Sequence, residues 1–251
     1  MKDPKIIEVT PGNISEMGVL CGGDAKYPEG QTKKIKWYQE RYKEGLRIKI
    51  LVDDQGVKTG MIEYVPGEYA WRTICAKGYT VIHCLQVLRN HTRQGFGSLL
   101  LNECIKDTEN TNGIVLLTSS KPWVNDKKFF LKNGFKMIDK APPYFELLLR
   151  PFREVPLPSF NDGWEERAIR CGGGITVFYS DQCPMFDYAI KNIAGASKEC
   201  GLEIKFQKMD TCDDAQNAPF PYGTFGIIKN GRFLTHRIYD KETYIALLKN
   251  G

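Results

Sequence analysis

One segment of the chain, at residues 93–98, has the composition of a phosphate-binding turn. Its sequence is Arg93-Gln94-Gly95-Phe96-Gly97-Ser98, and it lies between an apolar run over 81–87 and a leucine-rich stretch. Two glycines one residue apart allow the backbone to bend tightly and to approach a bulky ligand. The amides at the start of the following helix point outward, and the helix dipole favours negative charge there. The segment predicts a pyrophosphate site, with an ordinary tight turn as the alternative.

Three side chains in the same half of the chain are candidates for proton transfer. His83 lies in the apolar run before the turn, and an imidazole titrates near neutral pH, as a general base requires. Glu63, on the preceding predicted strand, is the next candidate, and Tyr144 is a candidate proton donor. The alternatives are a histidine satisfied within the core, a solvent-exposed glutamate and a tyrosine that only packs.

The elements that position these residues follow from the hydrophobic pattern. Before residue 150 it predicts strands over 5–9, 46–52, 58–65, 79–87, 114–118 and 144–149, and helices over 33–43, 95–109 and 125–132. After residue 170 it predicts strands over 175–179 and 203–208, a hairpin over 224–235, and helices over 183–200 and 241–249. Both halves are therefore α/β (α+β) in class, and the first is expected to be a mixed sheet flanked by helices.

A proline-containing stretch separates the two halves. Pro151, Pro156 and Pro158 disfavour both a helix and a central strand. We therefore expect a first domain over 1–152, a linker over 153–170 and a second domain over 171–251.

The turn and its flanking strand resemble the signature of the GNAT acetyltransferase superfamily. That signature is a strand ending in Leu-x-Val, then a Gly-x-Gly or Gly-x-Ala turn opening a helix, and Leu85, Val87, Gly95 and Gly97 match it. A later family motif, an apolar helix ending in Gly-Phe, is similar to residues 129–135. The resemblance covers roughly residues 5–150, and it implies a mixed, mostly antiparallel sheet.

The resemblance also implies an activity, which is transfer of the acetyl group of acetyl-CoA to a primary amine by direct attack on the thioester. The acceptor would be a small molecule or a peptide. The pantetheine arm of acetyl-CoA would pair with the backbone of Leu85 and Val87. The pyrophosphate would be held by the backbone amides of Gln94, Gly95, Phe96, Gly97 and Ser98. Four acidic residues are candidates for attracting a cationic amine, namely Glu40, Glu44, Glu63 and Glu68.

The chain departs from the family pattern at positions that matter for chemistry. Phe130 stands where the family often has the tyrosine that protonates the leaving CoA thiolate, and a phenyl ring cannot donate a proton. Val81 stands where the family often has a carboxylate base. A second hypothesis is therefore a non-catalytic acyl-CoA-binding sensor.

The second half resembles a thioredoxin-type domain. A predicted strand leads into Cys183-Pro184 at a helix start, but the second redox cysteine is absent because Phe186 stands three residues later. Cys183 is a candidate reactive thiol, since a helix N-terminus favours negative charge, and Cys212 is a candidate distant partner. A third hypothesis is thus a thiol-dependent redox protein centred on Cys183, with a structural remnant as the alternative. The two-domain order resembles bacterial YoaP-type acetyltransferases.

Composition excludes several function classes. The 251 residues carry a net charge of +5 without a basic cluster, and Lys33, Lys34 and Lys36 are expected on the solvated face of a helix. We therefore expect no nucleic-acid partner. The eight cysteines form no Cys-x-x-Cys pair, which argues against a metal site and favours reduced thiols in the cytoplasm. No apolar run approaches the ~20 residues of a membrane span, and the sequence leaves the oligomeric state open.

Overall fold

Seven strands form the larger of two main sheets in the computed structural model, which describes residues 4–21, 27–121 and 125–250. Their order across the sheet is β1 (Lys5–Val9), β2 (Arg47–Val52), β3 (Lys58–Pro66), β5 (Thr80–Val87), β6 (Gly113–Ser119), β8 (Phe145–Pro151) and β7 (Lys136–Ala141). Neighbours are antiparallel except β5 and β6, which are parallel. The expectation of a mixed, mostly antiparallel sheet is confirmed, whereas β7 was not predicted.

Strand alternation gives the larger sheet two apolar faces. Adjacent residues such as Leu116 and Leu117 on β6 belong to different buried clusters. Helix α3 (Phe96–Thr108) covers one face, where Leu100 is fully buried. Helix α2 (Pro28–Arg41) covers the other face and begins five residues earlier than predicted, because Pro28 suits the first turn of a helix. Each face needs its cover, since a buried leucine contributes about 1.5–3 kcal/mol.

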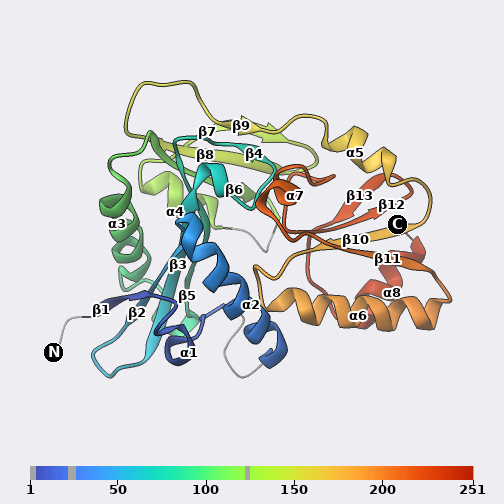
Figure 1. Cartoon of the computed structure of the whole chain (residues 1–251), viewed down its shortest axis with the longest axis horizontal. Helices are drawn as coiled ribbons and strands as arrows, with labels where there is room; N and C mark the ends of the chain where they lie inside the picture. Colours follow the sequence, from blue (N-terminus) through green and yellow to red (C-terminus); the bar gives the residue numbers. More distant parts are fainter. Residues whose placement is uncertain (1–3, 22–26, 122–124, 251) are drawn as a thin grey trace.

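The smaller sheet has four strands in the order β11 (Ile204–Lys208), β10 (Ile175–Tyr179), β12 (Phe225–Lys229) and β13 (Arg232–Thr235). β10 and β11 are parallel and are joined by α6 (Met185–Cys200), as predicted, while β12 and β13 form the predicted hairpin. Helix α8 (Lys241–Asn250) packs against α6 on one face of this sheet. Figure 1 shows α3 and the smaller sheet on opposite sides of the larger sheet.

The two sheets share one apolar core. Phe178, Phe220 and Ile228 of the second half belong to the same buried cluster as Trp71 and Ile48 of the first. The opposite face of the smaller sheet has a separate cluster beneath α6 and α8. The second half therefore covers, together with α2, the face of the larger sheet that α3 leaves open.

The stretch expected as a linker contains regular structure. β9 (Ser159–Phe160) pairs with β4 (Ile74–Cys75) of the first half, and α5 (Trp164–Arg170) packs against β13. The remaining short elements are α1 (Ile14–Met17), α4 (Lys127–Lys132), α7 (Cys212–Gln216) and the 3-10 turns η1 (Tyr42–Glu44), η2 (Gly67–Tyr69) and η3 (Arg89–His91). The boundaries at 152 and 171 stay a prediction.

Across the described ranges, none of the helices is both long and apolar enough to cross a membrane.

The shared core predicts one cooperative unfolding event for the whole chain. Separate domains with separate cores would melt independently, whereas neither half keeps its apolar face covered without the other. Scanning calorimetry should therefore give a single transition with equal calorimetric and van't Hoff enthalpies. Two resolved transitions, or an unchanged transition in a chain ending at Phe152, would contradict this view of the core.

Candidate active site

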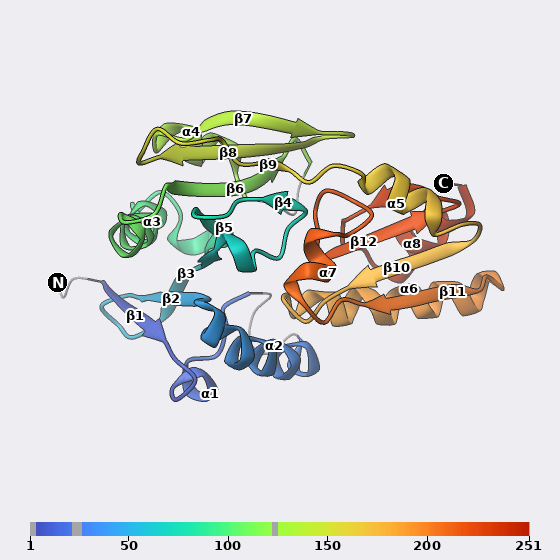
Figure 2. The same ribbon diagram turned by 45° about the horizontal axis from the view of Figure 1, so that its top comes forward.

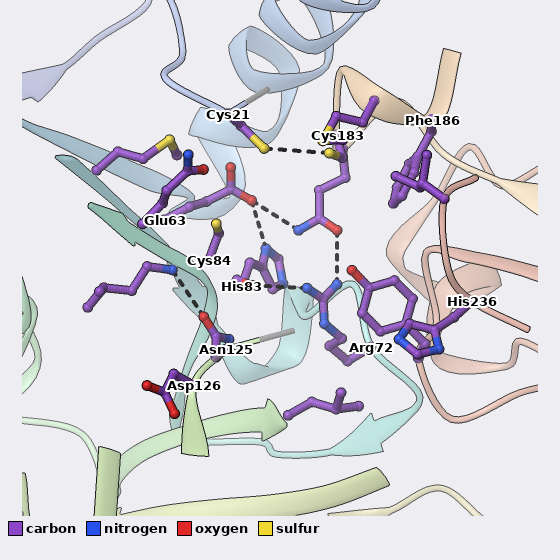
Figure 3. Close-up of a pocket in the computed structure, with 18 of the residues that line it drawn as sticks. Cys21, Glu63, Arg72, His83, Cys84, Asn125, Asp126, Cys183, Phe186 and His236 are labelled. Atoms are coloured by element: carbon purple, nitrogen blue, oxygen red, sulfur yellow. Dashed lines mark hydrogen bonds and ion pairs between the residues drawn. The ribbon is translucent and has the colours of Figure 1, made fainter. Parts of the chain in front are cut away.

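A cavity of about 500 Å³ lies between the two halves, on the face of the larger sheet that α2 covers. The first half contributes side chains from β3 and β5 to its wall, including Glu63 and His83. The second half contributes residues around the start of α6, and also Tyr222 and His236. Figure 3 shows Glu63 and His83 of the first half near Cys183 and His236 of the second. The site is thus built jointly.

Strand β5 has an unpaired edge beside this cavity. Its parallel pairing with β6 ends at Ile82 and Leu116, although β5 continues to Val87. The two strands therefore separate, and the last residues of β5 face an opening on that side.

The backbone groups at this edge point into the opening. Leu88 N–H donates to the Thr59 carbonyl on β3 at 2.8 Å. Because an antiparallel ladder alternates, the N–H groups of Leu85 and Val87 point away from β3. The side-chain oxygen Oδ1 of Asn125 accepts the Leu85 N–H at 3.1 Å. An extended ligand along this edge must replace Asn125 at Leu85.

The predicted phosphate turn lies at the start of α3. Gly95 is the N-cap with φ 81°, a left-handed conformation that glycine adopts without strain. Among the described residues, none accepts a hydrogen bond from the backbone amides of residues 94–98, whereas Leu99 N–H bonds the Gly95 carbonyl at 3.0 Å. A side-chain carbon added to Gly97 would lie 3.1 Å from the Phe129 ring. The turn therefore offers open amides at a helix N-terminus and little room for a side chain at Gly97, an arrangement that suits a phosphate ligand.

A buried ionic network forms the polar wall of the cavity. Glu63 is 2% exposed; one of its carboxylate oxygens pairs with Lys34 Nζ of α2. The other oxygen lies 3.2 Å from His83 Nδ1 and accepts a hydrogen bond from Gln182 Nε2 at 3.0 Å. Lys34 was expected on a solvated helix face, and this expectation was wrong because its ammonium reaches the buried carboxylate. Side chains of both halves therefore hold one negative charge.

The network fixes the protonation states of Glu63 and His83. The Trp71 backbone N–H donates to His83 Nε2 at 3.0 Å, so the neutral ring carries its proton on Nδ1 and donates to Glu63. Burial lowers the pKa of His83 to about 4, although the hydrogen bond to Glu63 acts in the opposite direction. Burial alone would raise the pKa of Glu63, but Lys34 and His83 lower it to about 2. At neutral pH the pair is a carboxylate beside a neutral imidazole without a free lone pair.

Arg72 links this network to the second half. Its guanidinium is buried and donates to the Gln182 side-chain oxygen at 2.9 Å and to the His83 carbonyl at 3.0 Å. The same group lies 4.9 Å from the centre of the Tyr222 ring. In the described part of the chain, Arg72 forms no ion pair with an acid. The wall of the cavity thus carries one cation, Arg72, and two carboxylates, the buried Glu63 and the exposed Asp126, while Lys34 pairs with Glu63 from outside the wall.

The other predicted catalytic residues lie in different surroundings. Tyr144 is outside the cavity wall, but its hydroxyl lies 3.1 Å from Nδ1 of His236, which is in the wall. Phe130 is buried between Phe129 and Phe135, each with ring centres 5.1 Å away. Of the four acidic candidates, only Glu63 lines the cavity, and Glu40, Glu44 and Glu68 do not.

Several lining residues could not be predicted from the sequence. Arg72 follows a strand and belongs to no recognisable motif, and Gln182 and Tyr222 come from the second half. Asn125 is the first residue of the helix predicted over 125–132, whereas the observed helix α4 begins at Lys127, and its position near the family's later motif could have suggested a role. Cys183 lines the cavity as well, together with Cys21 and Cys84. Cys212, the predicted partner of Cys183, is not among the lining residues.

Comparison with known proteins identifies the class. The model of the acetyltransferase (GNAT) family matches residues 20–135. A protein of Bacillus subtilis strain 168, described as the uncharacterized N-acetyltransferase YoaP, is 30% identical over 248 residues, which is 96% of this chain and 97% of the relative. The chain therefore belongs to the GNAT family of N-acetyltransferases. The expected enzyme class, an acetyl-CoA-dependent acyltransferase, is confirmed by this membership.

The similarity extends into the second half, where a YoaP-like family model matches residues 204–245. Solved acetyltransferase structures are also similar to part of this chain. An acetyltransferase from Thermus thermophilus is 15% identical with a TM-score of 0.44, covering 60% of this chain and 97% of its own. A GNAT acetyltransferase from Brucella melitensis, solved with acetyl-CoA, is 17% identical with a TM-score of 0.41, covering 64% of this chain and 98% of its own.

The two lowered pKa values predict a loss of stability in acid. Between about pH 6.5 and 4 the unfolded chain protonates His83 while the folded chain does not, and Glu63 behaves likewise from about pH 4.5 to 2. The free energy of unfolding should therefore fall as the pH drops through both ranges. The free energy of unfolding is measured by urea titration at several pH values for wild type and for His83→Gln, which keeps one donor and one acceptor. Between pH 6.5 and 4 it should fall more steeply with decreasing pH in wild type than in the variant. Identical slopes would mean that His83 titrates normally in the folded protein.

Proposed function

We propose that the enzyme transfers acetyl from acetyl-CoA to a primary amine of a small molecule or peptide within the cavity between its two halves. This proposal rests on one observation, which is that the open turn, the strand edge and the cavity adjoin one another. Open amides at residues 94–98 and the unpaired edge of β5 belong to neighbouring segments, and the same edge at Leu85 and Val87 lines the cavity. Phosphates, pantetheine arm and thioester would occupy these three places in turn.

The residues present fit acetyl-CoA. The backbone amides of Gln94, Gly95, Phe96, Gly97 and Ser98 would bind the pyrophosphate, since they are unbonded at a helix N-terminus. The backbone at Leu85 and Val87 would pair with the pantetheine arm in place of Asn125. When bound, the thioester supplies an activated acetyl carbon, and the protein supplies its orientation toward the amine.

The charges of the cavity favour a neutral amine. Among the buried charges at the cavity, Lys34 offsets Glu63 from behind the wall and Arg72 adds a positive charge, whereas the lining carboxylate of Asp126 is exposed to solvent. The buried part is therefore net positive, and nearby positive charge disfavours an ammonium ion. In this proposal Glu63 and His83 shape the polar wall, because the lone pairs of His83 are engaged and Lys34 neutralises Glu63. The amine would thus attack as the free base, having lost its proton before or on entry.

Protonated hydroxyls are available for the leaving thiolate. Burial raises the pKa of Tyr222, which lines the cavity, to about 12. Burial likewise raises the pKa of Tyr144 to about 12, and Tyr144 reaches the cavity through His236. Either tyrosine therefore carries a proton at neutral pH, in contrast to Phe130. This supports an active enzyme over the acyl-CoA-binding sensor.

The volume of the cavity limits the size of the acceptor. A volume of about 500 Å³ is within the range of small-molecule sites, and both halves enclose it, which favours a small molecule over a folded protein. The proposal places the enzyme in the cytoplasm. It also treats residues 171–251 as a thioredoxin-like domain, supported by a parallel strand-helix-strand unit followed by a hairpin.

The phosphate turn gives the sharpest test. Gly95→Glu should abolish acetyl-CoA binding in calorimetric titration, because a carboxylate would occupy the anion site. Gly56→Glu is the matched control, since Gly56 has φ 86°, Gly95 has φ 81°, and neither has a neighbour within 4 Å of an added side-chain carbon. Both variants carry similar backbone strain, of about 1–2 kcal/mol, so only the anion site distinguishes them.

Turnover separates the enzyme from the sensor. Wild type should bind acetyl-CoA at micromolar concentration and release CoA with at least one member of a panel of primary amines. Binding without turnover across the panel would favour the sensor, and equal binding by both glycine variants would remove the phosphate site from the proposal.

A further inference from the structure

Three thiols that acetyl transfer does not use line the cavity. Cys84 lies on β5, Cys21 lies in the segment between α1 and α2, and Cys183 lies two residues before α6. All three are free cysteines, and the sulfurs of Cys21 and Cys183 are 3.5 Å apart. Within the described ranges they form no group that holds a metal ion. The close pair joins the first half of the chain to the second.

The surrounding backbone holds this pair together. Helix α2 lies beside the start of α6 (Figure 2), and a side-chain carbon added to Gly30 would lie 2.1 Å from the Pro184 carbonyl oxygen. Lys33 pairs with Asp187 across the same contact, and Lys191 pairs with Glu29 at 2.7 Å. Pro184 directly follows Cys183, so the contact keeps the sulfur of Cys183 beside Cys21. A disulfide needs the sulfurs to close to about 2.05 Å, which is a shift of roughly 1.5 Å.

We propose that Cys21 and Cys183 form a thiol–disulfide exchange site whose substrate is a low-molecular-weight disulfide. In the first step the Cys183 sulfur attacks the small disulfide, forming a mixed disulfide and releasing one small thiol. In the second step the Cys21 sulfur displaces the second small thiol. The product is a Cys21–Cys183 disulfide, so the two protein thiols are oxidised, the small disulfide is reduced, and both thiol protons leave with the two released thiols.

The order of attack follows from the environment of each thiol. The hydrogen bond with Cys183 is the main cause that raises the pKa of Cys21, so Cys21 keeps its proton while Cys183 is reduced. Once Cys183 is in a mixed disulfide, that shared hydrogen bond is lost. The hydrogen bond with Cys21 and burial raise the pKa of Cys84, which disfavours Cys84 as the attacking sulfur.

The disulfide would also alter the acetyltransferase site. Both sulfurs are in the wall of the cavity, so their bonding would change its shape and tie α6 to the first half. This consequence rests on the proposed function, whereas the exchange reaction itself does not.

The test is peptide mapping of the full chain after incubation with 2-hydroxyethyl disulfide. We expect one intramolecular disulfide, between Cys21 and Cys183, with the loss of two hydrogens in the linked peptide pair and full reversal by dithiothreitol. Cys21→Ser should trap the small thiol on Cys183, and Cys183→Ser should abolish the intramolecular bond. Cys75→Ser, at an exposed cysteine outside the cavity, should form the Cys21–Cys183 disulfide to the same extent as wild type.

Two results would overturn the proposal: a Cys21–Cys84 disulfide as the main product, or modification of Cys75 while Cys183 stays reduced. Acetyl-CoA titration of the reduced protein is measured in parallel. If acetyl-CoA does not bind, the result counts against the acetyltransferase site alone. If the disulfide does not form, the result counts against the exchange site alone.

Discussion

The buried carboxylate of Glu63 is the interaction on which the joint site depends. Taking a charge out of water costs several kcal/mol, so Glu63 requires compensation from every direction. Lys34 supplies it from α2, His83 from the neighbouring strand, and Gln182 from the second half. Because Gln182 also accepts from Arg72, the position of the second half is fixed by polar geometry as well as by apolar burial. Removal of one partner would leave a buried charge uncompensated.

This arrangement explains why the second half is part of the enzyme. The first half carries the open strand edge and the predicted phosphate turn, but the face of its sheet above β3 and β5 is covered by α2 and by the second half. The cavity is closed by Tyr222, Cys183 and His236, none of which belongs to the first half. The first half provides the elements expected to bind acetyl-CoA, and the second half provides much of the surface that an acceptor would meet.

The sequence predicted most of the fold, because alternation and helical periodicity are local properties. The strands at the centre of the larger sheet and the parallel pair of the smaller one were found near their observed bounds. The tight turn at the start of α3 was also predicted at its observed place, since two glycines between a strand and a helix form a local motif. Short or exposed elements such as β7 and α5 were missed because they have weak apolar patterns.

The polar wall could not be predicted, because it depends on contacts between distant residues. Lys34 has the spacing of a surface lysine, and only the approach of β3 makes it a counterion for Glu63. His83 was a reasonable base by residue type, but the Trp71 amide that occupies its lone pair comes from a turn without a motif. Cys21 and Cys183 are 162 positions apart in the chain, so their contact follows only from how the two halves pack.

The central claim is that acetyl-CoA binds in a cavity shared by both halves, and protection of Cys183 tests it most directly. Alkylation of Cys183 should slow at least tenfold at saturating acetyl-CoA, while the exposed Cys75, as an internal control, reacts at an unchanged rate. Unchanged alkylation of Cys183 in protein that calorimetry shows to be saturated would contradict the account. It would mean that acetyl-CoA binds the first half without reaching the second.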